Sequence, residues 1–102
     1  MARITLNTLQ CEKKQDLTGK DEPVLYIADQ KVWEGKMEKG SSSPVNESRN
    51  FGKSVSVELK EKNGNTYKSL GSWTVLAHNR NNETLTASSS GYHYELYYSI
   101  AV

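Results

Sequence analysis

Apolar and polar residues alternate along most of this chain with a period of two. In residues 54–61, Val55, Val57 and Leu59 fall on one face, and serine, glutamate and lysine fall on the other. Successive side chains of a β-strand point to opposite faces of a sheet, so this pattern is typical of a half-buried strand. No segment has the apolar spacing of three and four residues that predicts an amphipathic helix. The sequence therefore predicts an all-β protein.

The same alternation continues to the end of the chain, in residues 92–102. One face carries Tyr92, Tyr94, Leu96, Tyr98, Ile100 and Val102, and the opposite face carries His93, Glu95, Tyr97 and Ser99. Shorter runs of strand-forming residues predict further strands at 3–11, 23–29, 31–37, 70–77 and 83–88. Short strands spaced about 8–12 residues apart predict an antiparallel two-sheet β-sandwich of about seven to eight strands.

Turn-forming residues separate these predicted strands. Glycine follows threonine, asparagine or serine at residues 18–19, 63–64 and 90–91. Such pairs are favoured in tight turns. The segment 40–50, GSSSPVNESRN, is rich in residues that break strands. We therefore interpret it as a mobile loop rather than a strand.

The first strand contains a change of phase. Ile4 and Leu6 share one parity, whereas Leu9 and Cys11 share the other. A β-bulge near residues 7–8 would direct both pairs inward, because a bulge adds one residue to one strand. Cys11 is then a small, unreactive core residue. The other residues predicted to form the core are Ile27, Val55, Val57, Leu59, Tyr94, Leu96 and Ile100.

The length of the chain predicts the number of domains, and its charge excludes some classes of function. A chain of 102 residues is expected to form one domain, residues 1–102. Its 13 basic and 12 acidic residues are well mixed and give a formal net charge of +1. This balance argues against nucleic-acid binding and against a polybasic tail that anchors the chain to a membrane.

The N-terminus and the single cysteine bear on the compartment. Cys11 is the only cysteine, so an intrachain disulfide is impossible. The first ten residues, MARITLNTLQ, lack the continuous apolar core of a signal peptide. No stretch approaches the run of about 18 apolar residues that a transmembrane helix needs. We expect a soluble protein, either cytoplasmic or exported by a leaderless route.

Residues 15–27, QDLTGKDEPVLYI, have the ingredients of a cation site. Asp16, Asp21 and Glu22 surround Gly19, and an apolar run follows. Ca²⁺ binds several oxygen ligands at about 2.3–2.6 Å, commonly carboxylates on a tight loop. The same residue types are common in a solvated turn that precedes a strand. From the residues alone, both interpretations stand.

This segment resembles the first calcium loop of the C-two (C2) domain, the lipid-binding β-sandwich of protein kinase C and synaptotagmin. That loop contains Asp, two residues, Gly, two residues, Asp-Pro-Tyr and then a strand. Asp16, Gly19, Glu22 and Pro23 match it, and Val24 replaces the aromatic residue. The resemblance implies a C2-like sandwich, in which calcium is the implied cofactor. It extends to small bacterial domains of this type, often found in secreted or toxin-associated proteins.

Residues 54–75 resemble the strand, third loop and following strand of the same family, but the loop departs from its pattern. The positions of the family's calcium aspartates fall on Lys60, Lys62 and Lys68, and only Glu61 and Asn63 offer substitute ligands. Lysines repel a dication. The predicted metal ligands are therefore Asp16, Asp21, Glu22, Glu61 and Asn63, with weak affinity and with the carboxylates paired mainly with these lysines.

The histidines, the tryptophans and Tyr97 are weaker candidates for functional residues. His78 and His93 lie outside any nucleophile motif, so we interpret both as solvent-facing. Of the two tryptophans, Trp73 is predicted to be more buried than Trp33, because of the C2 resemblance. Tyr97 is the better candidate for an exposed aromatic contact.

These observations favour a non-enzymatic binding module whose end loops engage a membrane surface, a glycan or a protein partner. The alternative is a structural or assembly component of a secreted toxin-type system, which would use an exposed sheet edge. An enzyme is disfavoured, because the sequence offers no acid–base pair for a catalytic pocket.

Overall fold

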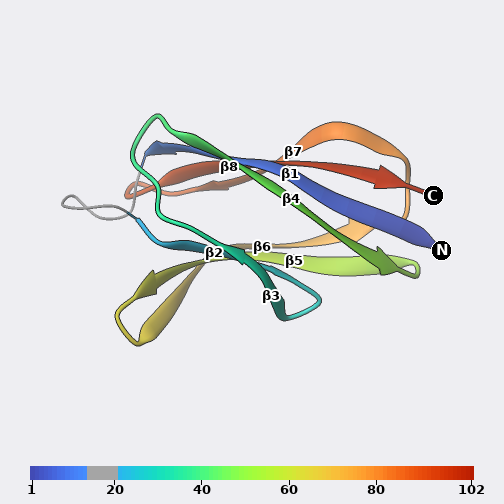
Figure 1. Cartoon of the computed structure of the whole chain (residues 1–102), viewed down its shortest axis with the longest axis horizontal. Helices are drawn as coiled ribbons and strands as arrows, with labels where there is room; N and C mark the ends of the chain where they lie inside the picture. Colours follow the sequence, from blue (N-terminus) through green and yellow to red (C-terminus); the bar gives the residue numbers. More distant parts are fainter. Residues whose placement is uncertain (14–20) are drawn as a thin grey trace.

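The computed structural model describes residues 1–13 and 21–102, and these residues form eight strands. The strands are β1 (Ala2–Lys13), β2 (Pro23–Ile27), β3 (Gln30–Glu34), β4 (Ser42–Phe51), β5 (Ser54–Asn63), β6 (Thr66–Leu76), β7 (Arg80–Ser88) and β8 (His93–Ala101). They make two four-stranded antiparallel sheets, in the orders β4-β1-β8-β7 and β3-β2-β5-β6, which face each other (Figure 1). The predicted antiparallel sandwich of about seven to eight strands is confirmed.

The predicted bulge lies in β1, the strand between β4 and β8. Its register shifts between Leu6 and Thr8 against both neighbours. The extra residue reverses the phase of the strand, so Ile4 and Leu6 before it and Leu9 and Cys11 after it are all fully buried. The change of phase in the sequence is therefore a structural bulge.

The core lies between the two sheets and contains every residue predicted for it. Tyr94, Leu96 and Ile100 of β8 face Val57 and Leu59 of β5, and all five are buried. Both tryptophans are half-buried and pack against the edge of this core. Trp73 fits there because Gly71 leaves space for its ring. A Cβ at Gly71 would lie 2.8 Å from that ring.

The interpretation of residues 40–50 as a loop is wrong, because Ser42–Phe51 form the edge strand β4. Its backbone pairs with β1 along most of its length, from Ser42 with Gln10 to Phe51 with Ala2. Pro44 and the positive φ of Asn46 are tolerated here because an edge strand has only one partner. Its apolar pattern is weak because few of its side chains reach the core.

The two ends of the sandwich differ. The N- and C-termini lie at one end (Figure 1). The opposite end carries the connections β3–β4, β5–β6 and β7–β8, together with residues 21–22 before β2 (Figure 1). We call this end, made of residues 21–22, 35–41, 62–68 and 89–92, the loop end. No helix in the described part of the chain is long and apolar enough to cross a membrane.

Candidate functional site

Three of the predicted metal ligands, Asp21, Glu22 and Glu61, lie close together at the loop end. Asp21 forms an isolated β-bridge with Met37, in which each backbone N–H donates to the other residue's carbonyl, at 3.0 and 2.8 Å. The carbonyl of Glu22 accepts a hydrogen bond from the backbone N–H of Lys62 at 3.0 Å. These contacts hold residues 21–22 beside the end of β5. Asp16 lies outside the described residues.

Asp21 points into the protein rather than toward solvent. Its side chain is fully buried, and the Tyr94 hydroxyl donates a hydrogen bond of 2.5 Å to its Oδ2. Burial, and then this hydrogen bond, raise the pKa of Tyr94 far above its usual value. The phenol therefore stays a neutral donor. Tyr94 belongs to β8, and Asp21 lies just before β2 of the other sheet, so this bond ties the segment before β2 to the facing sheet at the loop end.

Glu61 also points inward, from the end of β5, and is 3% exposed. Its Oε2 accepts the backbone N–H of Glu22 at 3.2 Å. Glu61 is paired in register with Pro23, which has no N–H to donate. The Glu61 carboxylate therefore supplies an acceptor for the backbone N–H of Glu22, the residue before the proline. Asn63, the last predicted ligand, is exposed at the β5–β6 hairpin, where its carbonyl accepts the Thr66 hydroxyl at 2.8 Å.

Of the lysines expected to pair with this loop, Lys60 contacts other residues of the sheet. Lys60 Nζ lies 3.9 Å from Glu58 and 4.7 Å from the centre of the Tyr26 ring. Asp21 and Glu61 are instead held inside the sandwich by hydrogen bonds from Tyr94 and from the Glu22 backbone. Both carboxylates are therefore buried and hydrogen-bonded, whereas a solvated turn would expose them.

The arrangement of the strands can be compared with known proteins. One solved structure, described as the structure of a C2 domain, matches with a TM-score of 0.66 and 9% sequence identity, covering 100% of both chains. The chain has a C2-domain fold. A C2 domain of plant Extended Synaptotagmin 1 matches with a TM-score of 0.60 and 12% identity, over 97% of this chain and 90% of that one.

Comparisons by sequence add no family or relative to this structural likeness. No protein-family model and no curated protein sequence matches the chain. The structural matches agree with the resemblance of residues 15–27 and 54–75 to C2 domains. They do not support a bacterial or toxin-associated origin.

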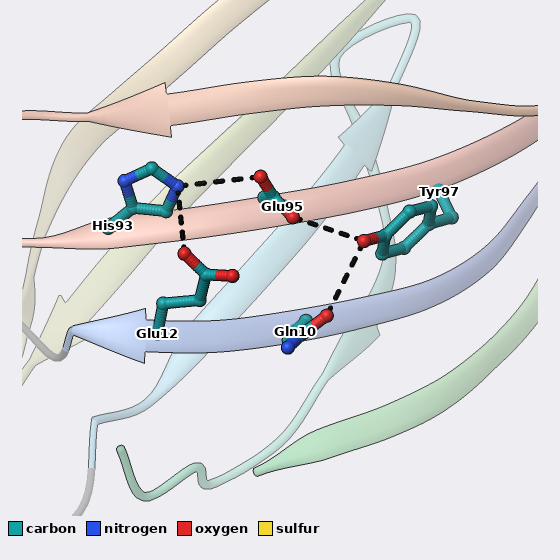
Figure 2. Close-up of polar contacts among 5 residues, drawn as sticks. All are labelled: Gln10, Glu12, His93, Glu95 and Tyr97. Carbon is teal, nitrogen blue, oxygen red and sulfur yellow. Dashed lines mark hydrogen bonds and ion pairs between the residues drawn. The ribbon is translucent and has the colours of Figure 1, made fainter. Parts of the chain in front are cut away.

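A second polar cluster, formed by Glu12, His93 and Glu95, was not predicted from the sequence. His93 is half-buried rather than solvent-facing, and its Nε2 lies 3.3 Å from Glu12 Oε2 and 3.6 Å from Glu95 Oε1 (Figure 2). His78, by contrast, is exposed as expected. His93 and Glu95 share a face in the predicted strand, but the approach of Glu12 depends on the pairing of β1 with β8. The cluster could be predicted only if the register between β1 and β8 were known.

Proposed function

We propose that the chain is a non-enzymatic C2-like binding module that contacts an anionic membrane surface with its loop end and requires no calcium. In this proposal residues 1–102 act as one domain, since both sheets contribute to one core cluster. The observation that carries the proposal is the inward orientation of Asp21 and Glu61. Because these carboxylates are buried, the charge that the loop end presents to solvent comes more from lysine.

Lysines and one tyrosine line the exposed part of the loop end. Lys36, Lys39 and Lys68 are exposed, Lys62 is half-buried, and Tyr67 is 46% exposed. A lysine near an anionic membrane contributes about 1 kcal/mol, and a tyrosine places its ring at the headgroup level. Glu22 and Glu38 lie on the same end and reduce this attraction. The expected binding is therefore modest and sensitive to salt.

Calcium is proposed as a weak ligand at most. The candidate set remains Asp16, Asp21, Glu22, Glu61 and Asn63. Ca²⁺ needs about six to eight oxygen ligands, and sites poor in ligands bind it at about 10⁻⁴–10⁻³ M. Asp21 and Glu61 would have to leave hydrogen bonds inside the protein to join such a site. This cost supports weak binding.

A vesicle experiment tests the proposal. The chain should sediment with vesicles that contain phosphatidylserine but not with phosphatidylcholine vesicles, equally in EDTA and in about 1 mM calcium. Replacing Lys36, Lys39 and Lys68 with glutamine should abolish sedimentation. A matched variant that replaces Lys31, Lys53 and Arg80 removes the same charge away from the loop end and should sediment normally.

Three results would overturn this proposal. Equal loss in both triple variants would mean that only overall charge matters. Calcium-dependent sedimentation that disappears in an Asp16→Asn, Glu22→Gln variant would instead identify a calcium-dependent lipid binder. Absence of any vesicle binding would reject the membrane and direct the search to glycan or protein partners.

A further inference from the structure

We infer that Glu12, His93 and Glu95 bind a divalent transition-metal cation of the zinc class. The three side chains meet on the outer face of the β4-β1-β8-β7 sheet (Figure 2). Asp21 and Glu61 are instead buried inside the sandwich. One ligand atom from each lies within 4.8 Å of the other two. The site is separate from the proposed calcium ligands and does not depend on membrane binding.

The pairing of two strands creates the cluster. His93 and Glu95 are two residues apart in β8, so both point outward while Tyr94 between them is fully buried. β1 runs antiparallel to β8, and its register shifts between Cys11 and Lys13. Glu12 is the residue without a cross-strand partner at this second bulge. Bulges re-aim side chains, and here the Glu12 carboxylate lies beside the imidazole of His93.

The distances from the imidazole nitrogen to the two carboxylates fit a bound cation. Zinc ligands lie at about 2.0–2.2 Å from the metal, so two tetrahedral ligands are about 3.3–3.6 Å apart. The distances from His93 Nε2 to Glu12 Oε2 and Glu95 Oε1 are 3.3 and 3.6 Å. A charge-assisted hydrogen bond between imidazolium and carboxylate would be shorter, at about 2.7–2.9 Å. The separations therefore suit a shared ion better than a direct ion pair.

The imidazole nitrogen provides an independent reason. His93 Nε2 is covered from solvent and has no hydrogen-bond partner among the described residues. The two carboxylates lie near this nitrogen without a hydrogen bond to it, and a buried polar atom that lacks a hydrogen bond calls for a bound ion or water. A cation between His93 and the two carboxylates would use the nitrogen's lone pair and offset their negative charge.

Neighbouring side chains hold one of the ligands in place. The Tyr97 hydroxyl donates to Glu95 Oε2 at 3.0 Å, which leaves Oε1 directed toward His93 (Figure 2). Gln10 Oε1 lies 3.4 Å from the same hydroxyl. Such support around a ligand is common in metal sites.

The donor types select the metal. One imidazole nitrogen with two carboxylates suits Zn²⁺, Co²⁺ or Ni²⁺, whereas Ca²⁺ and Mg²⁺ prefer oxygen alone. The side chain of Glu12 is 46% exposed and that of His93 is 30% exposed, so the site is open on one side. Three protein ligands and an open position leave room for water on the metal.

The test is calorimetric titration of the EDTA-treated full chain with zinc chloride. One Zn²⁺ should bind per chain, and the visible spectrum of bound Co²⁺ should report a site of low coordination number. His93→Gln and Glu95→Gln should each weaken binding by at least about tenfold, and Tyr97→Phe by about tenfold. His78→Gln removes the other histidine and should leave the affinity unchanged.

A thermal melt gives a second measurement. Zinc should raise the melting temperature of the wild type and of His78→Gln but not of His93→Gln, because a ligand stabilises only a fold that binds it. Melts in EDTA establish that each variant folds. Absence of saturable zinc binding, or equal affinity in His93→Gln and the wild type, would overturn the inference.

Discussion

At the scale of single residues, buried carboxylates distinguish this protein from an ordinary β-sandwich. Asp21 is 0% exposed and Glu61 is 3% exposed, and each has a hydrogen-bond donor from a different segment of the chain. A buried charge without such donors would cost several kcal/mol. These bonds therefore decide the conformation of residues 21–22 at the loop end.

Tyr94→Phe tests the contribution of the bond to Asp21. The substitution keeps the ring in the core but removes the donor, so the free energy of unfolding should fall by about 1–3 kcal/mol. Urea unfolding followed by fluorescence measures this. Tyr67→Phe, at an exposed tyrosine, serves as the control and should stay within about 0.5 kcal/mol. Equal stability of Tyr94→Phe and the wild type would contradict the assigned role.

At the scale of elements, β8 organises its sheet. It lies between β1 and β7, and every second side chain from Tyr94 to Ile100 enters the core. The edge strand β4 contributes few buried side chains and depends on backbone pairing with β1. The stability of the sheet should therefore be concentrated in β8 and β1.

Leu96→Ala tests this distribution. Leu96 is 1% exposed in β8, and removing its side chain should lower the free energy of unfolding by about 2–4 kcal/mol. Leu76→Ala is the matched control, because Leu76 is 55% exposed at the end of β6 and should change stability by less than about 0.5 kcal/mol. Chemical denaturation of the three proteins under identical conditions compares the two costs. Similar losses in both variants would contradict the predicted core.

At the scale of the whole molecule, the Tyr94–Asp21 bond ties the segment before β2 to β8 of the facing sheet, so the protonation state of Tyr94 affects global stability. The folded protein raises the pKa of Tyr94, whereas the unfolded chain has the usual value near 10. The stabilisation by neutral Tyr94 is therefore fully present below pH 10. It is lost as the pH rises above 10, because the unfolded state can then release the proton.

This linkage predicts that the wild type and Tyr94→Phe differ in how their free energy of unfolding changes at alkaline pH. Tyr94→Phe lacks the titrating group, so its stability should fall less than that of the wild type above about pH 10. The gap in free energy of unfolding between them should therefore narrow as the pH rises. Denaturation at several pH values from 8 to about 11 measures it. A constant gap would mean that Tyr94 titrates alike in both states.

The alternation of apolar and polar residues was enough to place most of the strands and the core, but not β4. Period-two alternation is a local property, and burial on one face follows from it, so residues 54–61 and 92–102 could be placed without tertiary information. The phase change in the first strand likewise required a bulge. The fold class was predictable because all of these signals lie within a few residues of each other.

The edge strand β4, the buried carboxylates and the cluster at His93 follow instead from which strands are neighbours in the folded protein. β4 is a strand because β1 supplies its backbone partners, not because its side chains alternate. Asp21 and Glu61 are internal because hydrogen-bond donors from β8 and from the Glu22 backbone meet them there. The cluster at His93 exists because β1 and β8, far apart in the sequence, pair in one register. Polar side chains carry no local signal of such partners, so only the assembled sheets bring them together.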